Sequence, residues 1–189
     1  MDKKQNIQPN THEEIAAEAA ACRTLFERKT RDYGTAWRVL RLPSLTDQIF
    51  IKASRIRSIE ESGENRVGDG VRGEFVAMVN YAVMALVQAS LTEADGLELE
   101  LERAMELYDS QLQQTLDLLD AKNHDYGEAW REMRVSSMVD LILMKLLRIK
   151  QIEDNGGRTE VSEGVEGGYR DIVNYSLFCL VRLTEETID

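Results

Sequence analysis

The two halves of the chain carry the same polar residues in the same order and spacing. The identical pairs include Lys29 and Lys122, Asp32 and Asp125, Tyr33 and Tyr126, Lys52 and Lys145, Arg55 and Arg148, and Asn80 and Asn174. Apolar positions exchange between the halves, as Ile51 does with Met144, which packing at constant volume permits. A hydrophobic core alone has no reason to fix lysine, arginine and aspartate. The repeated polar set therefore predicts a binding site for a charged ligand.

Two lysines are the most suggestive members of this set. Lys52 and Lys145 each lie in the middle of an apolar helical stripe, and an arginine follows one turn later. Burying an ammonium group costs several kcal/mol unless an anion or hydrogen-bond acceptors compensate. That anion is either a carboxylate, for which the candidates are Asp32, Glu60 and Asp171, or the phosphate of a substrate.

The last helix of each half supplies an amide and a carboxylate. Asn80 and Asn174 interrupt apolar sequence, and a buried amide must either bridge helices or contact a ligand. Asp171 precedes Asn174 by one turn, where it could meet Lys145 or a metal ion. The first half has alanine at the position of Asp171, and Glu74 one turn earlier is the replacement. The two halves therefore need not both be active.

Aromatic residues follow the first helix of each half. Tyr33 and Tyr126, or Trp37 and Trp130, offer rings on which a nucleobase can stack. The alternative is structural, because an Asp-Tyr-Gly turn closes a helix and tryptophan fills a core. We expect the two tryptophans to lie in the core, and we assign the neighbouring lysines and aspartates to the site.

The duplication and the 3.6-residue periodicity predict an all-α fold of two three-helix repeats related by a pseudo-two-fold axis. The predicted divisions are a tail (1–10), repeat 1 (11–91), a linker (92–96) and repeat 2 (97–189). Capping boxes are expected at Thr11 with Glu14, Ser44 with Asp47, and Ser137 with Asp140. The predicted helices span 11–29, 44–62, 74–91, 97–122, 137–154 and 169–183, and the loops at 63–73 and 155–168 could wrap a ligand.

Composition narrows the class of protein. The net charge of −11 argues against binding to duplex nucleic acid, whereas a small nucleotide can still bind in a local cationic cleft. The sequence offers neither a bilayer-spanning run nor a signal peptide, so we expect a cytoplasmic protein without membrane partners, and a homo-oligomer is compatible with it. Cys22 and Cys179 are expected to be buried thiols.

The combined motif resembles a known family. Lys-x-x-Asp-Tyr-Gly, then Lys-x-x-Arg-Ile, then Asp-x-x-Asn-Tyr before an apolar helix is similar to the nucleotide modification associated domain 1 family, across residues 20–90 and 112–183. This resemblance implies a function related to nucleotides, without specifying a reaction. The last helix also resembles the acidic helix of MazG-type all-α nucleoside triphosphate pyrophosphohydrolases, which hold Mg²⁺ with paired carboxylates. Here Gly168 and Ala77 occupy two of those acidic positions.

Three functions follow from these observations. The first is an enzyme that hydrolyses or modifies nucleotide phosphates with Mg²⁺; the second is a nucleotide-binding or regulatory module without turnover. The third is a structural helical protein, in which every cation of the set contacts a carboxylate and no cleft remains open. For the enzyme hypothesis, the residues expected to bind phosphate are Lys29, Lys52, Arg55, Lys122, Lys145 and Arg148. The expected catalytic residues are Asp32, Asp125 and Asp171, and the expected metal ligands are Glu74 and Asp171. The residues expected to contact the base or sugar are Tyr33, Asn80, Tyr126 and Asn174.

Overall fold

The described part of the chain forms six long α-helices and three short 3-10 helices, Ala36–Val39, Glu93–Asp95 and Ala129–Glu132. The computed structural model describes residues 10–65, 70–160 and 164–188, without the side chains of Tyr126 and Ile188. The predicted tail lies almost wholly outside these residues, as do parts of both predicted loops. The helices are α1 (Thr11–Tyr33), α2 (Leu42–Ser62), α3 (Val71–Ser90), α4 (Leu101–Tyr126), α5 (Val135–Asp154) and α6 (Val165–Ile188). The described residues include no strand, so the predicted all-α class is confirmed, and none of the described helices is long and apolar enough to cross a membrane.

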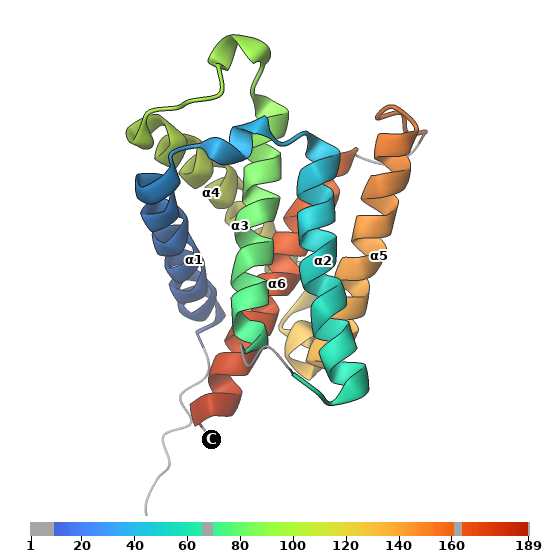
Figure 1. Ribbon diagram of the computed structural model, residues 1–189. Helices are drawn as coiled ribbons and strands as arrows, with labels where there is room; N and C mark the ends of the chain where they lie inside the picture. Colours follow the sequence, from blue (N-terminus) through green and yellow to red (C-terminus); the bar gives the residue numbers. More distant parts are fainter. Residues whose placement is uncertain (1–9, 66–69, 161–163, 189) are drawn as a thin grey trace, which may run out of the picture.

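The helices form three layers, each made of one helix from either repeat (Figure 1). Helices α3 and α6 make the most extensive contact and occupy the centre. Helices α2 and α5 pack on one side of this pair, and α1 and α4 on the other. The middle layer is thus covered on both sides, and it contains α3, the most apolar of the six helices.

Ion pairs between α2 and α5 follow the pseudo-two-fold symmetry. Asp47 on α2 pairs with Lys150 on α5, and the corresponding Asp140 on α5 pairs with Arg57 on α2 at 3.6 Å. The two aspartates therefore do not cap their helices, and the capping boxes predicted with Ser44 and Ser137 are wrong. The reason is that α2 and α5 begin earlier, after Arg41 and Arg134, neither of which makes a side-chain cap.

The ends of α1 show how its length was underestimated. The helix continues to Tyr33, and Gly34 follows with φ 62° and ψ −148°, a conformation open to glycine almost alone. Gly127 ends α4 in the same way. At the other end Asn10 is the cap, since its side chain accepts a hydrogen bond from the Glu13 N–H, so the capping box predicted at Thr11 is also wrong.

The predicted apolar stripes form the core. Leu45, Ile49 and Ile56 of α2 are fully buried. The corresponding residues of α5 are Met138, Ile142 and Ile149, and these are buried as well. Cys22 and Cys179 are buried free thiols, as predicted, and desolvation raises the pKa of Cys22 to about 12. Both thiols are therefore packing groups and not nucleophiles.

A polar cluster crosses from α2 to the second repeat. The Thr46 hydroxyl lies 2.7 Å from the Tyr169 hydroxyl and donates to Glu153 Oε1 at 2.8 Å. Burial raises the pKa of the Glu153 carboxyl above its ordinary value, and the two hydroxyl donors oppose this only in part. The folded protein consequently takes up a proton at Glu153 more readily than the unfolded chain does.

Glu153→Gln should therefore raise stability at neutral pH and weaken the pH dependence. The stabilising effect of the raised pKa is fully present when the pH is below the ordinary pKa of glutamate. It is lost as the pH rises through the pKa that Glu153 has in the folded protein. Glutamine stays neutral and keeps the Oε1 acceptor. Urea unfolding of both proteins between pH 4 and 7 should show the largest difference in free energy of unfolding at pH 7 and a shrinking difference towards pH 4. Parallel curves would contradict this account.

Candidate functional site

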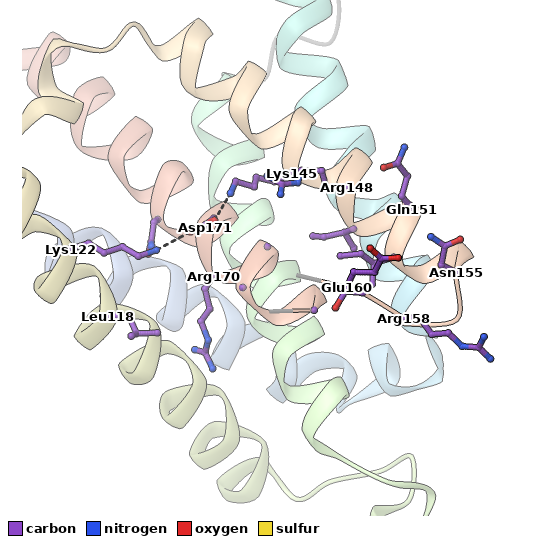
Figure 2. A pocket seen from close by; sticks show the side chains of 17 residues that line it. Leu118, Lys122, Lys145, Arg148, Gln151, Asn155, Arg158, Glu160, Arg170 and Asp171 are labelled. Carbon is purple, nitrogen blue, oxygen red and sulfur yellow. Dashed lines mark hydrogen bonds and ion pairs between the residues drawn. The ribbon is translucent and has the colours of Figure 1, made fainter. Parts of the chain in front are cut away.

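A large cleft opens on the second repeat. It has a volume of about 1020 Å³ and lies between the C-terminal half of α4, the middle and end of α5, the following loop and the first turns of α6 (Figure 2). Ligand pockets in proteins commonly measure roughly 300–1,000 Å³. The cleft is therefore large enough to hold a molecule of the size of a nucleotide.

Positive charge dominates the described lining of this cleft. Five cationic side chains line it, namely Lys122, Lys145, Arg148, Arg158 and Arg170. The carboxylates in the lining are Asp171 and Glu160. The chain as a whole has a net charge of −11, so this concentration of cations is local. A cleft of one sign with low-dielectric walls attracts ligands of the opposite sign.

Asp171 holds two of the lysines together. Its Oδ2 lies 2.7 Å from Lys145 Nζ on α5, and its Oδ1 lies 3.3 Å from Lys122 Nζ on α4 (Figure 2). One carboxylate thus gathers two ammonium groups from different helices at the cleft. The lysine in the apolar stripe of α5 meets a carboxylate, which was one of the two alternatives left open by the sequence.

The remaining cations have no carboxylate partner within the described part of the chain. Arg170 donates to neutral groups of α4, among them the Thr115 hydroxyl at 2.8 Å and the Gln111 carbonyl at 3.4 Å. Arg148 makes no ion pair there and is exposed. Arg158 lies on the loop after α5 with its guanidinium at the outer rim (Figure 2). Their charge is available to an anion in the cleft.

A glycine at the start of α6 allows this helix to approach α5 closely at the floor of the cleft. An added Cβ at Gly168 would lie 2.8 Å from the Ile149 side chain, and both residues line the cleft. In the first repeat the corresponding position is Glu74, which is buried.

A smaller pocket of about 340 Å³ adjoins the cleft. The two share Lys122, Asp171 and Asn174 in their linings. Most of its other walls are apolar and aromatic, formed by Leu119, Ala129, Trp130, Met133, Tyr175 and Phe178. A ligand spanning both would therefore meet a cationic region at one end and an apolar one at the other.

The first repeat holds the corresponding residues in ion pairs. Glu74 on α3 pairs with Lys52 at 3.4 Å and with Arg55. The carboxylate thus comes from one turn earlier than Asp171, as the sequence comparison predicted. Here a buried carboxylate neutralises both the lysine and the arginine, whereas in the second repeat the arginine is left without one.

Several predicted site residues lie away from the cleft. Lys29, Asp32 and Tyr33 are exposed at the end of α1, and Asp125 is exposed at the end of α4 beside His124. Asn80 is buried and fully engaged, since it donates to the Cys22 carbonyl at 3.1 Å and accepts from the Tyr108 hydroxyl at 2.6 Å. The side chain of Tyr126 is outside the described residues. The structure brings together Lys122, Lys145, Arg148, Asp171 and Asn174.

Three charged residues of the cleft are absent from the polar set that the repeats share. Arg170 is absent because the first repeat has Val76 at that position. Arg158 and Glu160 lie in a loop where an inserted residue breaks the alignment. Differences between the copies would have found Arg170, because a repeat that keeps a function departs from one that has lost it.

Metal binding by protein side chains alone finds little support in the donor set. Both oxygens of Asp171 are held by lysines, and Glu74 does not line the cleft. The described residues include no group of three or more histidine, cysteine, aspartate or glutamate side chains placed to hold a metal ion. Mg²⁺ in proteins is commonly bound by one or two carboxylates together with substrate phosphates. The two carboxylates of the cleft fit that second mode.

Comparisons with known proteins agree with the duplication. The family model described as nucleotide modification associated domain 1 matches residues 29–89 and 122–183, one segment in each repeat. Searches of curated proteins and of solved structures gave no match. The chain belongs to the nucleotide modification associated domain 1 family, with one matched segment in each repeat.

Proposed function

We propose that the second repeat binds a nucleotide, with the phosphate groups in the cationic cleft. The observation that carries this proposal is the lining of five cations and two carboxylates in a chain of net charge −11. Arginine and lysine form charge-assisted hydrogen bonds with phosphate oxygens, and one arginine can donate two parallel hydrogen bonds to the same phosphate. The family description supports a nucleotide as the source of the phosphate.

The purely structural alternative suits the first repeat better than the second. It requires each cation of the set to meet a carboxylate and the space between them to be filled. Lys52 and Arg55 satisfy this requirement through Glu74. In repeat 2, Arg148 of the set does not satisfy it within the described residues, and neither does Arg170, which lies outside the set; both line an open cleft. We therefore assign ligand binding to repeat 2 and a supporting role to repeat 1.

Binding without turnover is the part of the proposal that the geometry favours. A carboxylate that acts as a general base must be free to accept a proton from water. Asp171 is instead a counter-ion for two ammonium groups, and Glu160 lies exposed on the loop. Mg²⁺ would enter with the nucleotide and neutralise phosphate charge. Hydrolysis is to be measured alongside binding, because displacement of the lysines by phosphate would free Asp171.

A thermal-shift screen of nucleoside mono-, di- and triphosphates, with and without Mg²⁺, tests the proposal. A ligand at 100 times its dissociation constant should add about 2.7 kcal/mol of stability. Lys122→Met should weaken binding about tenfold, since it removes one charge-assisted contact. Lys29→Met removes the equivalent exposed lysine of repeat 1 and should have no effect. Equal affinities of the two variants, or no stabilisation by any nucleotide, would refute the proposal.

A further inference from the structure

The smaller pocket differs from its counterpart in the first repeat at the residues that would fill it. Leu119 lines the pocket, and the equivalent residue of repeat 1 is Phe26. The Phe26 ring stacks on Tyr108 with centroids 4.3 Å apart and nearly parallel planes. The Phe26 ring of repeat 1 is thus covered by an aromatic ring from α4, whereas the equivalent pair in the second repeat, Leu119 and Ile15, is aliphatic and lies beside a pocket walled by the stacked rings of Trp130 and Phe178.

The same comparison identifies a missing hydrogen-bond donor. Asn80 Oδ1 accepts from the Tyr108 hydroxyl, but the residue of α1 that corresponds to Tyr108 is Ile15, which has none. Asn174 is only 6% exposed, and its Oδ1 has no hydrogen-bond partner among the described residues. A buried amide oxygen without a partner costs free energy, and it is uncommon in native proteins.

The tryptophans provide a check on this reasoning. The indole N–H groups of Trp37 and Trp130 both lack partners within the described chain. Since this feature occurs in both repeats, it does not point to a ligand in either. The unpartnered amide oxygen is different, because Asn80 is satisfied and Asn174 is not.

We infer that the smaller pocket takes the flat ring of a nucleobase and that the Asn174 amide hydrogen-bonds to its polar edge. The inference rests on the proposed function, because the phosphates of the same molecule must lie in the adjoining cleft. The shared lining residues Lys122, Asp171 and Asn174 provide the continuity between the two regions. The ring replaces the aromatic stack of repeat 1, and an N–H group of the base replaces the Tyr108 hydroxyl.

Leu119→Phe tests the inference, because it installs the repeat 1 residue in the wall of the pocket. The probes are the eight common ribo- and deoxyribonucleoside triphosphates and inorganic tripolyphosphate, measured by calorimetry. Base stacking is worth enough to change affinity by about tenfold or more. The wild type should thus bind at least one nucleotide tenfold more tightly than tripolyphosphate. Leu119→Phe should abolish that difference and leave tripolyphosphate affinity within twofold.

Ile15→Tyr is the second variant. It offers Asn174 the hydroxyl that Tyr108 offers Asn80, and it should also reduce nucleotide affinity but not tripolyphosphate affinity. Unchanged nucleotide affinity in either variant, with the helical circular dichroism of the wild type, would overturn the inference. So would a wild type that binds nucleotides no more tightly than tripolyphosphate. Failure of both probes to bind the wild type would instead refute the phosphate site.

Discussion

Replacing Lys145 with Met and Arg148 with Gln together should weaken nucleotide binding by at least a hundredfold. Both side chains line the cleft, and Arg148 has no carboxylate partner among the described residues. A hydrogen bond to a charged group contributes about 1.5–3 kcal/mol, and a factor of ten corresponds to about 1.4 kcal/mol. The loss of two such contacts should therefore lower the affinity by more than a hundredfold. Isothermal titration calorimetry at fixed ionic strength gives the measurement.

A matched control separates a site effect from a charge effect. Arg28→Gln with Lys29→Met removes the same total charge from exposed positions on α1. This control should bind nucleotides like the wild type. Lys145→Met leaves Asp171 paired with Lys122, so the double variant should keep its fold. If it binds with wild-type affinity, the cationic cleft has no role in phosphate recognition.

The fold could be predicted because the duplication and the apolar periodicity carry most of its information. Leu45 and Met138 occupy equivalent core positions in α2 and α5, as the stripes predicted. The helix starts were harder. Ser44 with Asp47 has the sequence of a capping box, but Asp47 instead forms an ion pair with Lys150 on α5. Local sequence does not show which partner a carboxylate meets across the bundle.

The candidate site was only partly predictable for a related reason. Identity between repeats selected Lys145 and Asn174, which line the cleft, but it equally selected Asp32 and Tyr33, which are exposed at a helix end. Residues are retained in both copies for structural as well as functional reasons. One difference between the copies is Glu74 against Gly168, and the effect of such a change depends on packing between helices that the sequence alone does not give.

Glu74→Ala should cost more stability than any other single change considered above. The Glu74 side chain is 12% exposed and neutralises Lys52 and Arg55, whose side chains are 30% and 24% exposed. Removing one partner of a buried ion pair costs about 3–5 kcal/mol, since the remaining charge is left uncompensated. The partial exposure of both cations places the expected loss near the lower end, about 3 kcal/mol. Urea unfolding followed by circular dichroism measures it.

Asp171→Ala is the informative comparison, because it removes the carboxylate of the open repeat. Lys122 and Lys145 face a cleft that admits water, so their charge can be hydrated when the carboxylate is lost. The expected loss is smaller, about 1 kcal/mol, because the Asp171 side chain is 23% exposed against 12% for Glu74, and Lys122 is 55% exposed. Tripolyphosphate should restore stability to Asp171→Ala and not to Glu74→Ala, because only the first leaves its cations accessible. Equal losses with no rescue would mean that the two repeats are equally closed and that Asp171 is purely structural.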